Sequence, residues 1–432
     1  MVAKQRAAEI SDLLAQINMP ALLKLASSLN NGSECIANPG STSMMGCCNY
    51  HLHIIFPISG QKWLVRVPRP GYAKLHDVID IEYQYASEFA TLKFLENTAV
   101  PAPKAFAYGV ASNAENDIGV TYLIMEFLEG KPFNPLSATV DERRIAYEGV
   151  AKMMIELSKW PLSKACSLVP PNSGEKHAEP VIGGIAGLRS KIVPPLGPFD
   201  TAEEFYSAII SEHLNLIANG KLYTEMAVEA YLAYAILQDH VSELLPLPLQ
   251  GSSINAVFET QRAGREELFF LTHIDAKGDH ILISPRGEIS GIIDWQGARF
   301  APFTEAFGPS LFTADLHSLY NLPTSSEEVF NGCETDSGIN PNDHLLASLL
   351  KEYGESRMAE TMTRNDKVRR FHFGLRSAKT QDEMWESVKG LLGSFGLYNG
   401  EILEEWRRKG LIRYKGDARL ETILERGDQL AM

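Results

Sequence analysis

The segment LTHIDAKGDHILI, which runs from Leu271 to Ile283, gathers ionisable side chains at the start of an apolar strand. Phosphoryl transfer is a chemistry that such a segment could support. It requires a carboxylate to orient or deprotonate the attacking hydroxyl, oxygen ligands for Mg²⁺, and a cation on the nucleotide phosphates. The ionisable residues of the segment are His273, Asp275, Lys277, Asp279 and His280.

A second carboxylate, Asp294, follows in the segment IIDW, 19 positions after Asp275. The strand patterns HILIS and EISGIID flank the turn PRG, which predicts a β-hairpin. A hairpin brings Asp275 and Asp294 to the same end of two adjacent strands. Asp275 then suits the base, with His273 ordering its loop, and Asp294 suits a metal ligand. Both could instead be ordinary turn and strand-end residues, but their joint placement disfavours that alternative.

Two charged residues nearer the N-terminus could complete such a site. Arg66 lies in the strand pattern QKWLVRVP, which forms a predicted hairpin with CCNYHLHIIF across the turn PISG. Glu88 lies in the helical pattern VIDIEYQYASEFATLKFLENTAV. Arg66 could bind the nucleotide phosphates, and Glu88 could position it from the helix. A solvated helix residue is the alternative for Glu88.

The elements that must hold these residues predict an α+β fold with a small sheet-containing lobe and a large, mainly helical lobe. Residues 1–35 form a predicted helical lead, because their apolar residues recur at helical spacing. Residues 36–128 are predicted as strand, strand, helix, strand, strand. Residues 129–432 are mostly helical and contain the catalytic loop, 271–296.

Length and composition limit the possible functions. A chain of 432 residues is too long for one compact core, so two or more domains or lobes are expected. The formal net charge of −14 argues against nucleic-acid binding, which relies on basic surfaces. An acidic surface favours solubility and could also attract a cationic substrate.

Five cysteines are spaced neither as a zinc site nor as a disulfide framework, which indicates a reduced setting. The N-terminus lacks the pattern of a signal peptide. No apolar run approaches the roughly 18 residues that a membrane span needs. We therefore expect a cytoplasmic chain that binds no membrane.

The segments HIDAKGDHILI and IIDW resemble the catalytic loop and metal-binding aspartate of the protein-kinase-like fold. They are more similar still to those of the aminoglycoside phosphotransferase and choline kinase family, including its fungal-type members. The resemblance covers roughly residues 36–320 and implies a bilobal fold that binds ATP and Mg²⁺. Other segments follow in the expected order: MMGCCNYHLHIIF as phosphate loop and second strand, WLVRVPR as third strand, SEFATLKFLENTAVPAPKAFAYG as helix and exit, and LIMEFLEG as hinge.

The resemblance also implies roles for individual residues. Asp275 would be the catalytic base, and Asp294 would chelate the metal. Arg66 would replace the nucleotide-binding lysine and pair with Glu88, and Lys277 would touch the γ-phosphate. The other nucleotide-binding candidates are Asn49, the gatekeeper Met125, and the backbone of Glu126 and Leu128.

Besides Arg66 in place of the lysine, His280 and the phosphate loop also depart from the family pattern. His280 occupies the position of the Mg²⁺-binding asparagine, although Mg²⁺ prefers oxygen ligands. Either Asp279 takes over, or the second metal is absent, or the preference has moved to a metal such as Mn²⁺. A hydrogen bond from His280 to a phosphate is a further alternative. The phosphate loop has only Gly40 and Gly46, with the bulky Met44 and Met45 between them.

Three functions are compatible with these residues. The leading hypothesis is an ATP-dependent kinase that phosphorylates a hydroxyl of a metabolite or antibiotic-like compound, with the acceptor site built by helical segments 200–250 and 343–426. A pseudokinase-like binder is the second, although retention of Asp275 and Asp294 speaks against it. The third is an ATP-using enzyme that activates its substrate by phosphorylation for condensation or elimination. The acceptor and the oligomeric state are not readable from the sequence.

Overall fold

The chain consists of two compact units, according to the contacts within it. Unit 1 comprises Met1–Gly149, Cys166–Pro198 and Leu271–Arg299, and unit 2 comprises Val150–Ala165, Phe199–Phe270 and Phe300–Met432. The domain boundaries drawn from the sequence stay a prediction. The computed structural model describes residues 2–39, 46–135, 137–171, 179–188, 193–245, 267–315, 319, 338–375, 378 and 380–431.

Parts of three predicted segments lie outside the described residues. They include Gly40, Met44 and Met45 of the phosphate loop, 246–250 of the first acceptor segment, and 376, 377 and 379 of the second.

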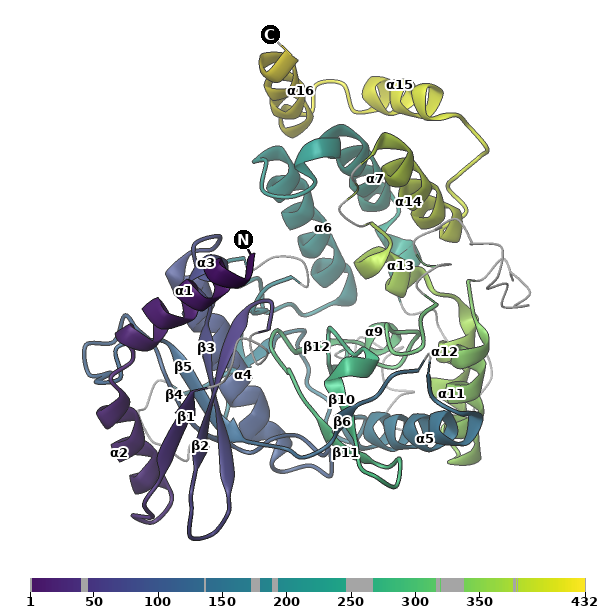
Figure 1. The fold of residues 1–432 in the computed structure, drawn as a ribbon. Coiled ribbons are helices and arrows are strands. Elements are labelled where there is room, and N and C mark those ends of the chain that lie inside the picture. The colour runs from purple at the N-terminus through teal and green to yellow at the C-terminus, as the bar shows by residue number, and fades with distance from the viewer. Residues whose placement is uncertain are drawn as a thin grey trace. The chain divides into compact units, whose positions relative to one another are not determined.

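Unit 1 is built on a five-stranded antiparallel sheet with the order β1-β2-β3-β5-β4 (Figure 1). β2 and β3 form the predicted hairpin, in which His51 pairs with Arg66. Arg66 also pairs with Leu123 of β5, so it lies on a central strand. The strands are β1 (Ile36–Pro39), β2 (Asn49–Ile55), β3 (Lys62–Pro68), β4 (Ala105–Gly109) and β5 (Tyr122–Glu126).

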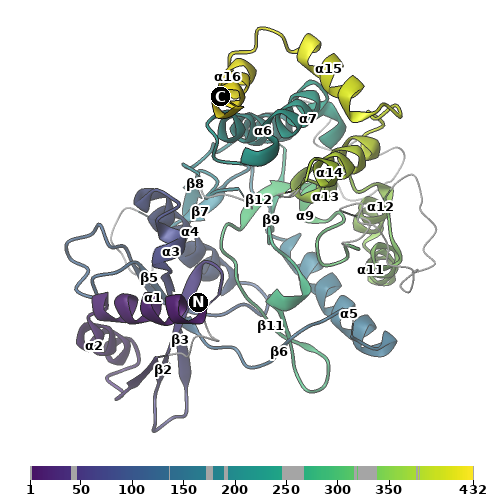
Figure 2. The same ribbon diagram turned by 45° about the horizontal axis from the view of Figure 1, so that its top comes forward.

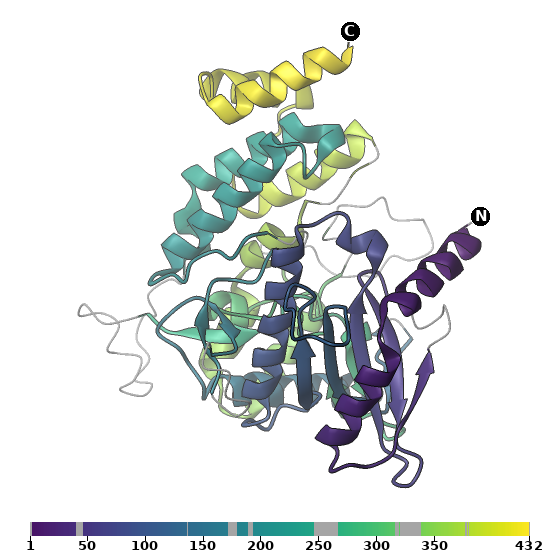
Figure 3. The ribbon, with the colours of Figure 1, turned by 90° about the vertical axis from the view of Figure 1, so that its left-hand side faces the viewer.

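Helices cover both faces of this sheet. The predicted helical lead forms α1 (Val2–Gln16) and α2 (Met19–Leu29), which share one hydrophobic core with β2 and β3. Side chains alternate along a strand, so Val65 and Val67 enter this core while Arg66 faces the other side. There α4 (Val78–Leu95) supplies Glu88. Figure 3 shows α1 and α2 on one side of the strands and α4 on the other.

The second predicted hairpin is also present in unit 1. β10 (Ile281–Ile283) pairs antiparallel with β11 (Ile289–Ile292), and β6 (Lys131–Pro132) pairs with the other edge of β10. A 3₁₀ turn, η5 (Gly278–His280), leads into β10. The remaining short elements of unit 1 are α3 (Pro70–Ala73) and β7 (Ser167–Val169) with β8 (Val181–Gly183). The strands β9 (Phe269–Thr272) and β12 (Arg299–Pro302), which pair with each other, have residues in both units.

Unit 2 is mainly helical, as expected. α6 (Ala202–Ala218) is capped by Thr201, whose side chain accepts a hydrogen bond from Glu204 N at 3.2 Å. α6 packs against α7 (Ala227–Asp239), and α14 (Gln381–Ser394) packs against α7 (Figure 2). The other elements of unit 2 are η2 (Thr224–Met226), η3 (Val241–Leu244), α9 (Phe303–Ala306), α11 (Pro341–Glu352), α12 (Ser356–Arg364), α13 (Lys367–Phe373), α15 (Leu403–Arg413) and α16 (Ala418–Ala431). α5 (Val140–Leu157) begins in unit 1 and ends in unit 2.

The predicted α+β fold class is confirmed by this combination of a small antiparallel sheet and a helical unit. Among the helices that the structure describes, none is both long and apolar enough to cross a bilayer.

Candidate active site

Arg66 lies at the centre of the candidate site in unit 1. Its guanidinium donates through Nη1 to Glu88 Oε1 and through Nη2 to Asp294 Oδ1 at 2.9 Å. Arg66 is 4% exposed and Glu88 is 1% exposed, so this ion pair is shielded from water. β3, α4 and the end of β11 thus bring together three residues that are far apart in the sequence.

Burial and charge shift the pKa values of these groups in opposite directions. Burial raises the pKa of Glu88 to about 7, because the charge of Arg66 only partly offsets the loss of water. Burial also disfavours the charged form of Asp294. The charge of Arg66 outweighs that penalty, so the pKa of Asp294 lies below its usual value. The site therefore keeps Asp294 as a carboxylate.

Gln296 is a site residue that the sequence reasoning missed. Its Oε1 accepts hydrogen bonds from Arg66 Nη2 at 3.0 Å and from Asn49 Nδ2 at 3.2 Å. Its Nε2 donates to Gln84 Oε1 at 2.6 Å. The available signal was its position, two residues after Asp294, as a polar side chain between Trp295 and Gly297.

Asn49 belongs to the same hydrogen-bond network. It is 5% exposed, and its Oδ1 accepts a hydrogen bond of 2.6 Å from Tyr85 Oη of α4. Both ends of its amide are therefore used inside unit 1. A nucleotide contact by Asn49 stays a prediction.

His273 orders the loop that carries Asp275. Its Nε2 donates to Ile293 O at 2.9 Å, and its Nδ1 accepts from Asp275 N at 3.3 Å. This pair of bonds assigns the proton to Nε2 and describes a neutral ring. Burial lowers the pKa of His273 below its usual value, which agrees with a neutral ring. These contacts support the loop-ordering role.

Asp275, Lys277 and Asp279 lie together on the loop. Lys277 Nζ is 3.3 Å from Asp275 Oδ2 and 3.6 Å from Asp279 Oδ2. The side chain of Asp275 is 27% exposed, which leaves it accessible to an acceptor hydroxyl, and that of Asp279 is 61% exposed. The glycine between Lys277 and Asp279 is closely packed, since a Cβ at Gly278 would lie 2.6 Å from Phe133 O.

His280 connects the loop to Asp294. Its Nδ1 lies 2.9 Å from the backbone oxygen of Asp275, and its Nε2 lies 3.4 Å from Asp294 Oδ2. Asp294 has a φ of 65°, in the left-handed region that aspartate tolerates better than most residues. This backbone conformation orients the carboxylate between Arg66 on one side and His280 on the other.

The predicted hinge residues lie at the end of β5. Met125 is 4% exposed and pairs with Leu64 of β3. The backbone N–H of Glu126 already donates to Lys104 O at 2.8 Å. A hydrogen bond from adenine to this residue would therefore have to be accepted by its carbonyl oxygen. The side chain of Leu128 packs over Gly291 of β11. The adenine-binding role of Glu126 and Leu128 stays a prediction.

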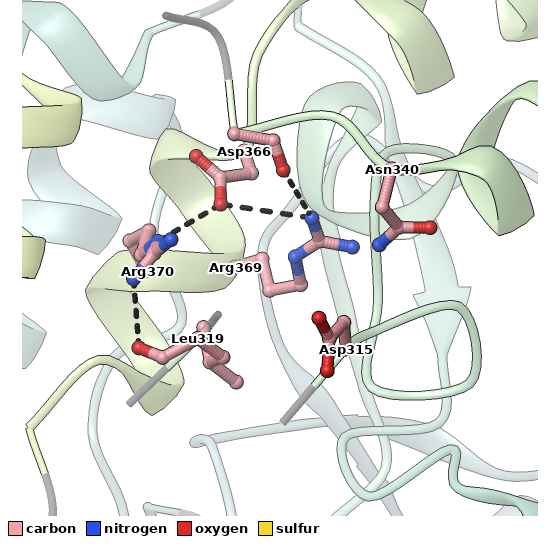
Figure 4. Close-up of a pocket in the computed structure, with 7 residues that line it drawn as sticks. Asp315, Leu319, Asn340, Asp366, Arg369 and Arg370 are labelled. Atoms are coloured by element: carbon pink, nitrogen blue, oxygen red, sulfur yellow. Dashed lines mark hydrogen bonds and ion pairs between the residues drawn. The ribbon is translucent and has the colours of Figure 1, made fainter. Parts of the chain in front are cut away.

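A small pocket in unit 2 is occupied by an ion-pair network (Figure 4). Arg369 donates from Nη1 to Asp343 Oδ1 at 2.9 Å and from Nη2 to Asp343 Oδ2 at 3.1 Å. Arg370 donates to Asp366 at 2.9 Å and to Leu319 O at 2.7 Å. These bonds tie the start of α13 to α11, so the charges of this pocket serve the fold.

A family model described as the phosphotransferase enzyme family matches residues 57–318, which is more than half of the chain. Among curated relatives, a subtelomeric hrmA-associated cluster protein of Aspergillus fumigatus, known from two strains, is 29% identical over 310 residues. The match covers 62% of this chain and 59% of the relative, so the chain spans less than two thirds of that protein's length.

Solved structures with a similar arrangement include an ethanolamine kinase of Plasmodium vivax and a putative aminoglycoside phosphotransferase of Ralstonia eutropha. The former is 12% identical, with a TM-score of 0.47 and coverage of 91% of this chain and 86% of its own. The latter is 15% identical, with a TM-score of 0.43 and coverage of 95% and 99%. The family match confirms the resemblance stated from the sequence, and the chain belongs to the phosphotransferase enzyme family.

Proposed function

We propose that this chain is an ATP-dependent phosphotransferase that moves the γ-phosphoryl group to a hydroxyl of a small molecule. One observation carries the proposal. Arg66, Asp294, His280 and Asp275 form a continuous series of contacts within unit 1, with the Arg66–Asp294 hydrogen bond at 2.9 Å and the His280–Asp294 approach at 3.4 Å. Phosphoryl transfer requires a cation, a strand-end carboxylate and a base in this proximity.

In the proposed reaction, Asp275 accepts the proton of the acceptor hydroxyl on a carboxylate oxygen. The acceptor oxygen forms a bond to the γ-phosphorus, the bond from that phosphorus to the β,γ-bridging oxygen breaks, and ADP leaves. Lys277, whose Nζ lies 3.3 Å from Asp275, is near enough to stabilise charge on the transferred group. Arg66 would bind the nucleotide phosphates, with Glu88 fixing its orientation.

The family implies a Mg²⁺ ion, and the donors present do not match it well. Mg²⁺ favours an octahedral shell of oxygen ligands. Here Asp294 Oδ1 is taken by Arg66, and the group beside Oδ2 is an imidazole nitrogen. Within the described ranges, no three His, Cys, Asp or Glu side chains are arranged to hold a metal ion. The steps assigned above therefore use this chain's own residues.

Calorimetric titration with ATP tests the proposal, with Mg²⁺, with Mn²⁺ and without metal. Binding should be lost in Asp294→Asn and kept in Asp275→Asn, because only Asp294 lies beside Arg66. A screen of small-molecule alcohols for ADP release should then show turnover that falls by about 10²–10⁴ in Asp275→Asn, the usual contribution of a general base. Failure to bind ATP under every condition would contradict the proposal.

Two other outcomes would favour the alternative functions. Binding of ATP with no turnover of any acceptor would indicate a pseudokinase-like binder, which the Arg66 contact to Asp294 would suit. Release of inorganic phosphate together with a product that carries none would indicate an enzyme that activates its substrate for condensation or elimination. A phosphorylated alcohol, identified by ³¹P NMR, would support the leading proposal.

A further inference from the structure

The orientation of the His280 ring is set by its backbone contact. Nδ1 lies 2.9 Å from Asp275 O, and a carbonyl oxygen can only accept a hydrogen bond. Nδ1 therefore carries a proton, and in the neutral ring the lone pair is on Nε2. The backbone of His280 is held as well, because the N–H of Ile293 donates to His280 O at 2.9 Å. The side chain is 12% exposed, so it has little freedom to turn away.

His280 Nε2 lies close to two carboxylate oxygens. Asp294 Oδ2 is 3.4 Å away and Asp279 Oδ1 is 4.0 Å away, and Nε2 makes no hydrogen bond to any residue that the structure describes. A charge-assisted hydrogen bond from a protonated ring would be shorter, about 2.7–2.9 Å. A neutral imidazole nitrogen and a carboxylate oxygen 3.4 Å apart are both electron donors, and one cation bound to both would satisfy them.

The spacing also suits one shared cation. Metal–nitrogen and metal–oxygen bonds of divalent ions are about 2.0–2.2 Å long. Two donors 3.4 Å apart can therefore bind one ion without moving. Asp294 can offer only Oδ2, since Oδ1 accepts from Arg66 at 2.9 Å. The pair thus supplies one oxygen and one nitrogen.

We propose that His280 Nε2 and Asp294 Oδ2 bind a divalent cation that accepts nitrogen ligands, of the Mn²⁺ class, in preference to Mg²⁺. Imidazole suits transition metals, whereas Mg²⁺ is held by oxygen. Nucleotide phosphates and water would complete the coordination shell, and in that respect the inference rests on the proposed function. His280 then determines which metal the site selects.

Pulsed electron paramagnetic resonance on the full chain tests this directly. Mn²⁺ is added alone and together with a non-hydrolysable ATP analogue, and the electron spin-echo modulation is recorded. Coordination by His280 should produce a ¹⁴N coupling that disappears in His280→Asn. His240→Asn, the same substitution in unit 2, is the matched control and should keep the coupling.

Affinity provides the second measurement. Calorimetry with Mn²⁺ and with Mg²⁺ gives the ratio of the two affinities for wild type and for His280→Asn. The ratio should shift toward Mg²⁺ by at least about tenfold in the variant, because asparagine restores an oxygen donor. Thermal unfolding checks that the variant folds. If it does not, the ¹⁴N signal of the wild-type chain still decides the question.

The outcomes separate this inference from the proposed function. No ¹⁴N coupling in the wild type, or the same metal ratio in both proteins, would overturn the inference even if ATP binds. A ¹⁴N coupling with Mn²⁺ alone would support it even if no nucleotide binds, a result that would instead contradict the proposed function.

Discussion

Arg66 and Asp294 are 228 positions apart in the chain and are joined by a hydrogen bond of 2.9 Å. The other Nη atom of the same guanidinium donates to Glu88, so one planar group links a helix carboxylate to a strand-end carboxylate. An ammonium group is a compact charge on a flexible stem and does not have this fork geometry. The arginine at this position therefore sets how β3, α4 and the Asp294 turn are connected.

Arg66→Lys should weaken this connection. The lysine can pair with Glu88 or reach toward Asp294 and Gln296, but it cannot reproduce both sets of bonds. We expect the free energy of unfolding to fall by about 1–3 kcal/mol and ATP affinity to fall by about tenfold. Urea unfolding and calorimetry measure the two effects.

Arg413→Lys is the matched control for that substitution. Arg413 pairs with Asp239 at 2.7 Å, but its side chain is 53% exposed, and such surface pairs contribute at most about 1 kcal/mol. Equal losses in Arg66→Lys and Arg413→Lys would show that the buried fork has no special role.

The pKa of Glu88 predicts a pH dependence of stability. The pKa is about 7 in the folded chain and 4.5 in the unfolded reference, so the folded chain binds the extra proton between these values. The contribution of Glu88 to stability is therefore fully present below pH 4.5 and is lost as the pH rises through 7. The loss amounts to roughly 3 kcal/mol.

Glu88→Gln should remove this slope, because an amide keeps an acceptor for Arg66 but cannot titrate. Urea unfolding at a series of pH values from 5 to 8 compares the variant with the wild type. Glu129→Gln serves as control, since the Glu129 side chain is 77% exposed in its pair with Lys62. If the free energy of unfolding changed with pH in the same way for wild type and Glu88→Gln, Glu88 would not titrate in this range.

Gly278→Ala should distort the catalytic loop. The new Cβ would lie 2.6 Å from Phe133 O and 2.9 Å from Pro135 Cδ, so the loop must shift away from β6. We expect a cost of about 1–3 kcal/mol and a loss of turnover with smaller change in ATP affinity, because Asp275 and His280 flank the shifted residue.

The control for that substitution is Gly393→Ala in α14, where a Cβ would meet no atom within 4 Å. It should be neutral or stabilise the helix by up to about 1 kcal/mol. A Gly278→Ala variant as stable and as active as Gly393→Ala would exclude close packing of the loop.

The pocket network of unit 2 should behave as one coupled structure. Asp343 is fully buried and accepts two hydrogen bonds from Arg369, so Asp343→Ala leaves this buried cation with only the more distant carboxylate of Asp366, 3.6 Å away. We expect a loss of about 3–5 kcal/mol. In a double-mutant cycle with Arg369→Ala, the double variant should lose at least about 1 kcal/mol less than the sum of the single losses. Additive losses in urea unfolding would show that the pair is uncoupled.

The sequence by itself determined the local elements and the types of the candidate site residues. The alternation of QKWLVRVP and the turn PISG predicted the β2–β3 hairpin, and HILIS with the turn PRG predicted the β10–β11 hairpin; both are present. Helical periodicity predicted the N-terminal helices, which are present as α1 and α2. These features depend on residues close together in the chain, whose patterns and turn chemistry are readable directly.

Tertiary structure alone decided which side chains meet. The packing of β3, α4 and β11 decides three features of the site. These are the contacts of Gln296, the left-handed backbone of Asp294, and the approach of His280 Nε2 to Asp294 Oδ2. No periodicity records such contacts, because each joins residues that are distant in sequence and depends on side-chain orientation within a packed interior. The sequence identified His280 as an unusual residue at its position. Only the folded chain showed that its Nε2 atom lies beside Asp294 Oδ2.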